Sequence, residues 1–112
     1  MAHDCHNIVA IGSDDTYLVR AINRIIEMQG GQVVISPDEM LDIPLPIAGL
    51  MSPFSGSETA ILTIRIHEMV KQIGCQMKSP FITMAFMCLP VIPDIKLTDR
   101  HLMDTTNMSI IV

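Results

Sequence analysis

Two histidines, an aspartate, a cysteine and an asparagine stand together near the start of the chain, in the stretch AHDCHN (residues 2–7). Imidazole, carboxylate and thiolate groups bind metal ions, and His and Asp side chains transfer protons in enzymes. No other stretch of this sequence concentrates as much of that chemistry. Three interpretations are open. The stretch is a metal site, or the edge of an active site that another domain or subunit completes, or a polar turn in which Asp4 and Asn7 bond local backbone.

The spacing of the two histidines disfavours a metal site within this chain. His3 and His6 are three residues apart, so they would share a face only in a helix. The stretch precedes a predicted strand, where residues three apart point to opposite faces. A closed zinc site needs four ligands, and no second pair stands at a matching spacing. We therefore predict no metal ligand and no catalytic residue in this chain, and name His3, Asp4, His6 and Asn7 as candidates for an active-site edge.

The remaining reactive side chains suggest no separate site. We expect His67 on the polar side of a helix and His101 in a surface loop. Cys75 and Cys88 lie in apolar stretches without a neighbouring base, which is typical of small core residues rather than nucleophiles. The sequence contains no nucleophile elbow, phosphate-binding loop or dinucleotide fingerprint.

Hydrophobic patterning predicts the elements that position this stretch. NIVAIG (residues 7–12) predicts a buried strand. Residues 13–31 predict a helix that Ser13 or Asp14 caps and that Gly30 and Gly31 end. QVVIS (residues 32–36) predicts a second strand, so residues 7–36 form a plausible parallel, right-handed strand–helix–strand crossover. A short strand at residues 40–43 is also plausible.

The second half of the chain predicts one long helix and more strands. Ser55 and Glu58 have the spacing of a capping box, which predicts a helix over residues 55–75 that ends at Gly74. Residues 81–89 are apolar on both faces and predict a central strand. We expect a loop with one helical turn, capped by Thr98 or Asp99, over residues 94–104, and an edge strand at residues 108–112. The class is α+β, close to α/β, in one domain over residues 1–112, with a mixed sheet of four to six strands covered by two main helices.

Composition excludes several classes of function. The 112 residues carry a net charge of −5, with seven scattered Lys and Arg, so we expect no nucleic-acid binding. No apolar run reaches the length of a membrane span, and three widely spaced cysteines suit a reducing cytoplasm. Only 17% of residues are charged against about 25% in average domains, and 49% are hydrophobic. Part of the apolar surface therefore meets a partner.

Four stretches, in this order, resemble the C-terminal domain of adenine deaminases of the amidohydrolase superfamily. They are AHDCHN before a strand that ends in Gly, AINRIIEMQGGQVV, IPLPIAGLMS and PFITMAFMCLPVIPDIKLTDRHLMD. The resemblance runs from Ala2 nearly to the end of the chain, and its proline-punctuated apolar strings are specific. One departure is Cys5, because the family usually carries Ser at that position.

The resemblance implies an activity that this chain does not perform alone. Adenine deaminases hydrolyse adenine to hypoxanthine and ammonia in purine salvage, using a divalent metal (manganese, iron or zinc) in a barrel that precedes this domain. The chain has no H-x-H pair and no barrel, so we expect a fragment that packs on the barrel, forms a homo-oligomer and is inactive by itself. His3, Asp4, His6 and Asn7 would then lie near the barrel mouth. The alternatives are a stand-alone oligomerisation or binding module and, more remotely, a metal-binding protein that uses HDCH.

Overall fold

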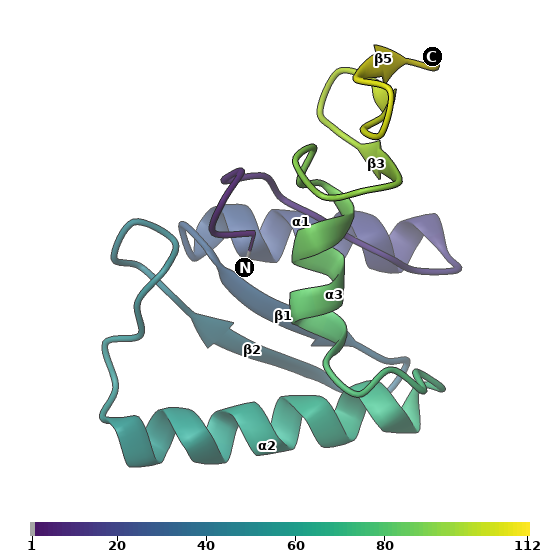
Figure 1. Cartoon of the computed structure of the whole chain (residues 1–112). Coiled ribbons are helices and arrows are strands. Elements are labelled where there is room, and N and C mark those ends of the chain that lie inside the picture. Colours follow the sequence, from purple (N-terminus) through teal and green to yellow (C-terminus); the bar gives the residue numbers. More distant parts are fainter. Residues whose placement is uncertain (1) are drawn as a thin grey trace.

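A computed structural model describes residues 2–112 of the chain, and in that range the chain forms three helices and five short strands (Figure 1). The elements are α1 (Asp15–Glu27), β1 (Gly31–Ile35), β2 (Met40–Pro44), α2 (Gly56–Gln72), α3 (Pro80–Met87), β3 (Ile95–Leu97), β4 (Leu102–Asp104) and β5 (Ser109–Ile110). The predicted α+β class is confirmed. The strands form two antiparallel sheets, β1-β2 and β3-β4-β5, rather than one mixed sheet.

Both predicted long helices form, and polar side chains start them as expected. The Asp14 carboxylate accepts hydrogen bonds from the backbone N–H groups of Thr16 and Tyr17 at the start of α1. At the start of α2, the Ser55 hydroxyl accepts from the backbone N–H of Glu58, and the Glu58 carboxylate accepts from the backbone N–H of Ser55. These bonds satisfy N–H groups that a helix cannot pair internally.

The core lies where α2 packs on the β1-β2 hairpin. In Figure 1 the hairpin runs between α1 and α2. The core residues are Val34, Ile43, Leu45, Ile66, Met69 and Val70. An ion pair between Arg24 Nε and Asp42 Oδ2, 2.7 Å apart, joins α1 to β2. The predicted strand at residues 40–43 is confirmed, and so is the one at 32–36, which runs one residue earlier as β1.

The predicted strand at residues 7–12 is wrong for this chain. These residues, which we call the N-terminal segment, run extended toward α1, but they belong to no strand. Their backbone groups form no hydrogen bond with any other residue of the described range 2–112. The parallel crossover predicted for residues 7–36 is therefore absent as well, and β1 pairs only with β2, in antiparallel register.

The predicted strand at residues 81–89 is also wrong, because this stretch forms α3. Pro80 occupies the first turn of the helix, where its fixed φ and missing N–H cost nothing. An apolar run this short has no periodicity that separates a buried strand from a buried helix. Only Pro80 and Ala85 of α3 are buried, and Ile82, Phe86 and Met87 are exposed. The helix thus shows apolar side chains on almost every side.

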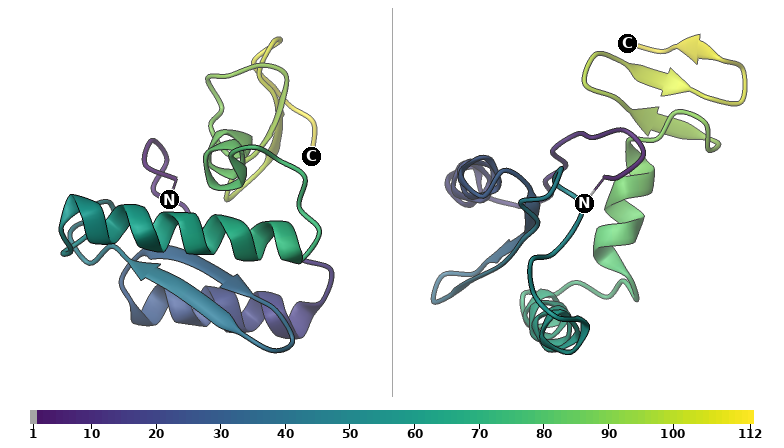
Figure 2. Two further views of the ribbon diagram at one scale, coloured as in Figure 1. Left: turned by 90° about the horizontal axis from the view of Figure 1, so that it is seen from below. Right: turned by 90° about the vertical axis from the view of Figure 1, so that its left-hand side faces the viewer.

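The C-terminal residues form a small sheet where we expected a loop with a helical turn. β3 and β4 pair as a hairpin over residues 95–104. Thr98 does act as a cap, but of a turn: its hydroxyl accepts from the backbone N–H groups of Arg100 and His101. The predicted last strand is confirmed as β5, which pairs with β4. Figure 2 shows this sheet at one end of the molecule, beyond α3. Within residues 2–112, no helix is long and apolar enough to cross a membrane.

Candidate functional site: a polar turn at the rim of an apolar groove

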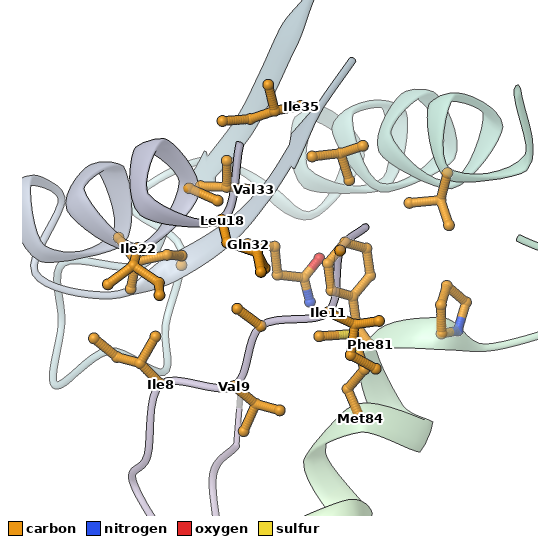
Figure 3. A pocket seen from close by; sticks show the side chains of 18 of the residues that line it. Ile8, Val9, Ile11, Leu18, Ile22, Gln32, Val33, Ile35, Phe81 and Met84 are labelled. Carbon is orange, nitrogen blue, oxygen red and sulfur yellow. The ribbon is translucent and has the colours of Figure 1, made fainter. Parts of the chain in front are cut away.

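A groove of about 1340 Å³ separates the N-terminal segment from β1. Its lining comes from the N-terminal segment, α1, β1 with the turn after it, the loop at residues 48–50, the end of α2 and α3, and more of it is apolar than polar. Figure 3 shows Ile8, Val9, Ile11, Leu18, Ile22, Val33, Ile35, Phe81 and Met84 around it, with Gln32. Pockets for small molecules typically have volumes of roughly 300–1,000 Å³ and converging polar groups. This groove is larger and has few such groups, so it resembles an uncovered interface more than a substrate pocket.

A tight turn at one end of the groove carries the polar residues that the sequence singled out. The backbone N–H of His6 donates to the carbonyl of Ala2 over 2.7 Å and closes the turn. His6 has a positive φ of 54°, which is uncommon for a residue other than glycine. His6 and Asn7 line the groove, whereas His3 and Asp4 lie outside its lining. The polar-turn interpretation is thus correct for the backbone, although the bond that closes the turn is not one from Asp4 or Asn7.

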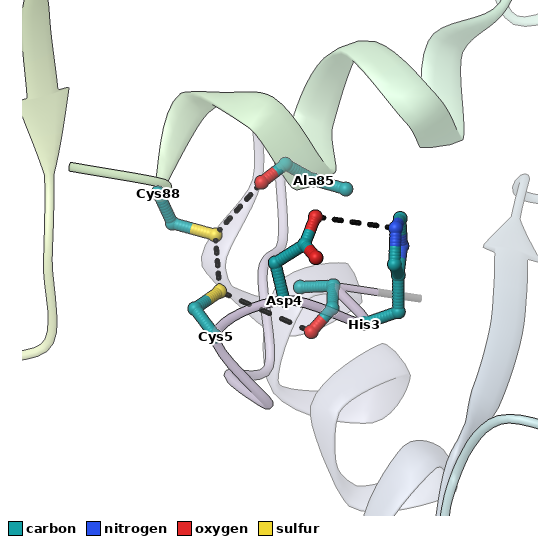
Figure 4. A network of polar contacts seen from close by, with 6 residues as sticks. His3, Asp4, Cys5, Ala85 and Cys88 are labelled. Carbon is teal, nitrogen blue, oxygen red and sulfur yellow. Dashed lines mark hydrogen bonds and ion pairs between the residues drawn. The ribbon is translucent and has the colours of Figure 1, made fainter. Parts of the chain in front are cut away.

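His3 and Asp4 form an exposed pair. His3 Nε2 lies 3.2 Å from Asp4 Oδ2, and each side chain is 49% exposed (Figure 4). A carboxylate beside an imidazole can orient the ring through a hydrogen bond. Both side chains are open to solvent, and such exposed pairs contribute little to stability. A general acid or base must lie within hydrogen-bond reach of a bound substrate, and His3 and Asp4 lie outside the lining of the groove.

A thiol contact that the sequence did not reveal fixes the turn to α3. Cys5 Sγ lies 3.0 Å from Cys88 Sγ, and Cys88 Sγ also contacts the carbonyl oxygen of Ala85 at 3.2 Å (Figure 4). Ala2, Ala85 and Cys88 form a small buried cluster around this contact. Burial, and after it the hydrogen bond with Cys5, raise the pKa of the Cys88 thiol to about 11. Cys88 is therefore a neutral core side chain, as the sequence predicted.

No group of three or more His, Cys, Asp or Glu side chains that could hold a metal ion forms within residues 2–112. The residues of the polar turn therefore do not fit a metal centre. The predicted positions of the other histidines are only partly right. His101 is exposed, but the His67 ring stacks on Phe81 of α3, with ring centroids 5.9 Å apart. This stack could not be predicted from the sequence, because it depends on residues 80–87 forming a helix.

The fold and the surface thus define a class: a small α+β domain with an exposed polar turn beside an open, mainly apolar groove. A protein-family model described as the adenine deaminase C-terminal domain matches residues 1–109. The chain belongs to this family.

Curated relatives agree with that assignment. The adenine deaminase of Archaeoglobus fulgidus is 48% identical over 104 residues, which are 93% of this chain and 19% of that protein. The adenine deaminase of Methanosarcina barkeri is 42% identical over 111 residues, 99% of this chain and 20% of that protein. The chain therefore spans about a fifth of the length of the curated relatives it matches. No solved structure matches it.

Proposed function

We propose that this chain is the C-terminal domain portion of an adenine deaminase that hydrolyses adenine to hypoxanthine and ammonia in the cytoplasm. The observation that carries the proposal is the family match over residues 1–109, together with relatives named adenine deaminase that are about five times longer. The chemistry resides in the remaining four-fifths, in a barrel that holds a divalent metal: manganese, iron or zinc. The present chain packs on that barrel, is inactive alone, and joins a homo-oligomer.

Within this proposal, the polar turn forms one edge of the adenine site. His3, Asp4, His6 and Asn7 orient the substrate or relay protons, and the barrel supplies the groups that complete the site. The exposure of His3, Asp4 and His6 supports this, because side chains that face solvent in the separate domain are free to face a substrate in the assembled enzyme. The pairing of His3 with Asp4 gives that edge an imidazole of fixed orientation.

A domain replacement tests the proposal. The matched 104 residues of the Archaeoglobus fulgidus adenine deaminase would be replaced by this chain, and conversion of adenine to hypoxanthine would be followed in the presence of manganese. We expect the replacement enzyme to be active, and both this chain alone and the enzyme truncated at the same boundary to be inactive. A folded replacement enzyme that is no more active than the truncated one would refute the proposed function.

The same enzyme tests the role of the polar turn. We predict that His3→Ala and His6→Ala each lower turnover by roughly a hundredfold or more, the usual contribution of a positioned proton-transfer group. His101→Ala, an exposed histidine in the β3-β4 turn, is the matched control and should leave turnover unchanged. Melting temperatures should be equal in all three variants. Unchanged turnover in the His3 and His6 variants would mean that these residues form a structural turn and have no role in catalysis.

A second candidate is a stand-alone module that associates through the same apolar surface. The many exposed hydrophobic side chains, among them Ile8 and Ile11, favour some partner without naming it. The molar mass of the isolated chain in solution separates the two functions. A stable oligomer of well-defined mass, together with an inactive replacement enzyme, would favour the module.

A further inference from the structure

Two lines of unpaired backbone groups border the groove. On one side runs the N-terminal segment, whose N–H and C=O groups bond to no residue of the described range. On the other side runs the free edge of β1. Unpaired groups next to an apolar surface are costly once that surface is covered, because they lose water and gain no partner.

The register of the hairpin shows which groups of β1 are free. Gly30 accepts from the backbone N–H of Leu45, and Ser36 donates to the carbonyl of Glu39. Bonding alternates along an antiparallel pair, so Gln32 and Val34 direct their backbone groups toward β2. Gly31, Val33 and Ile35 therefore direct theirs away from β2, and all three line the groove. This edge is a template for a further strand.

The groove also constrains the chemistry of what fills it. Among the described residues that line it, the charged side chains are the carboxylates Asp14, Asp38 and Glu39, with no Lys or Arg. The rest of its lining is uncharged side chains, mostly apolar, with some amides and serines, and Ile8 and Ile11 in it are at least half exposed. An occupant that is apolar, extended and free of acidic side chains satisfies both the backbone edge and the lining.

We propose that an extended, apolar segment from the part of an adenine deaminase that precedes this domain fills the groove as a β-strand between the N-terminal segment and β1. This inference depends on the proposed function, because it takes the occupant from the same enzyme. About four-fifths of the length of each curated relative lies outside the part that this chain matches, and it precedes a domain that is C-terminal by name. That chain enters the present domain next to Ala2, which itself lines the groove. A strand supplied at this point reaches β1 without crossing the core.

Hydrogen exchange in the domain-replacement enzyme tests the inference directly. The isolated 112-residue chain and the replacement enzyme would be compared by mass spectrometry over residues 7–12 and 31–36. We expect the amides of these two stretches to exchange at least roughly a hundredfold more slowly in the replacement enzyme, because new strand pairing protects them. Residues 56–66 of α2, outside the groove, should change little. An active replacement enzyme without protection at both stretches would overturn the strand while leaving the proposed function intact.

Substitutions at two equally exposed isoleucines distinguish an interface in the groove from one elsewhere on the surface. Ile11 in the groove and Ile64 on the outer side of α2 are each 58% exposed. We expect Ile11→Glu to abolish the protection in the replacement enzyme and Ile64→Glu to preserve it. Equal loss of protection in both variants, or loss of protection only in the Ile64 variant, would place the interface on another face and overturn the inference.

If the replacement enzyme does not fold, a peptide scan tests whether a segment of the parent enzyme binds in the groove. Overlapping synthetic peptides would cover the four-fifths of the Archaeoglobus fulgidus enzyme that this chain does not match, and each would be titrated into the ¹⁵N-labelled 112-residue chain. We expect an apolar peptide without acidic residues to shift the amide resonances of residues 7–12 and 31–36, and Ile11→Glu to weaken its binding. No binding peptide, or shifts confined to other residues, would overturn the inference.

Discussion

Cys88 illustrates how burial controls the chemistry of a single side chain. It is a buried thiol between Ala85 and Cys5. Burial raises its pKa to about 11, from an ordinary value of 9.0. The thiolate is the reactive form of cysteine, and at pH 7.5 a pKa of about 11 leaves only roughly three thiolates in ten thousand. The sulfur is therefore chemically silent at neutral pH even though it touches a second thiol.

We predict that iodoacetamide at pH 7.5 alkylates Cys88 far more slowly than the partly exposed Cys75 of the same chain. Peptide mass spectrometry after timed quenching would give both rates, and the Cys88 rate should rise steeply only as the pH approaches 11. The raised pKa also favours folding below pH 9, and this contribution is lost as the pH rises from about 9 to about 11. Cys88→Ala should reduce the fall in melting temperature over that interval. Equal alkylation rates at pH 7.5 would contradict the burial of Cys88.

Gly31 holds a conformation that side chains disfavour at the start of β1. Its φ is +151°, and a Cβ at this position would overlap the carbonyl oxygen of Ile43 on the paired strand. We predict that Gly31→Ala destabilises the chain by more than about 1 kcal/mol, because the native conformation is incompatible with the added methyl group. Gly56→Ala is the matched control, since a Cβ there meets no atom within 4 Å. Urea unfolding of both variants measures the difference, and similar midpoints would contradict the assigned conformation of Gly31.

At the scale of elements, α2 and α3 offer an internal comparison of helix capping. Each begins at a serine, but the Ser55 side chain caps α2, whereas Ser79 makes no side-chain bond to α3. We predict that Ser55→Ala lowers the melting temperature by about 4 °C and that Ser79→Ala leaves it nearly unchanged. Differential scanning calorimetry of both variants gives the comparison. Equal losses would mean that the capping box does not stabilise α2.

The pH dependence of the stability lost in Ser55→Ala shows whether the bond with ionised Glu58 is the one that stabilises α2. The Ser55 side chain, and then its backbone N–H, hold the pKa of Glu58 below its ordinary value of 4.5. A lowered pKa stabilises the fold above pH 4.5, and this stabilisation is lost as the pH falls through the folded-state value. The difference in melting temperature between wild type and Ser55→Ala should therefore become smaller as the pH falls below 4.5. A difference that stays constant down to pH 2 would exclude the ionised Glu58 as the partner.

These elements show how far the sequence alone can predict this fold. Helix caps are local, so Asp14 and Ser55 were sufficient to place α1 and α2. The stretch at residues 81–89 carried no such signal except Pro80, and its apolar pattern suits a buried strand as well as a helix. The N-terminal segment has the composition of a strand but no neighbour to pair with, and pairing is a tertiary property that composition does not contain.

The candidate site, like the fold, could be predicted only where the signal is local in the sequence. The types of His3, Asp4, His6 and Asn7 marked this stretch as a candidate site, but their spacing left a polar turn, an active-site edge and a metal site open. The contact of Cys5 with Cys88 could not be predicted, since 83 positions separate them and only the placement of α3 joins them. The groove likewise depends on parts of the chain that are far apart in the sequence, from the N-terminal segment to α3. Only its consequence, a surface rich in apolar side chains, was visible in the composition.

At the scale of the whole molecule, the chain divides into a packed half and a loosely attached end. The core residues all come from β1, β2, α2 and Leu45. Beyond residue 94, by contrast, Thr105 is the only buried residue of the described chain, and Ile95, Leu97 and Ile110 are exposed. Thr105 joins the sheet to the preceding loop, where its hydroxyl donates to the carbonyls of Ile92 and Asp94. Sheets of two or three very short strands need a packed face for stability, and β3-β4-β5 has almost none.

We therefore predict that β3-β4-β5 opens independently of the core. Amides of β4 should exchange with deuterium at least roughly a hundredfold faster than those of residues 66–70 in α2, because opening free energies follow buried apolar contact. Thr105→Val, which keeps the shape but removes both hydroxyl bonds, should accelerate exchange in β4 and leave α2 unchanged. Ile66→Ala, at a residue only 1% exposed, is the opposite control and should accelerate exchange in the core. Equal exchange rates in β4 and α2 would instead mean that the chain unfolds as one cooperative unit, with the C-terminal sheet as stable as the core.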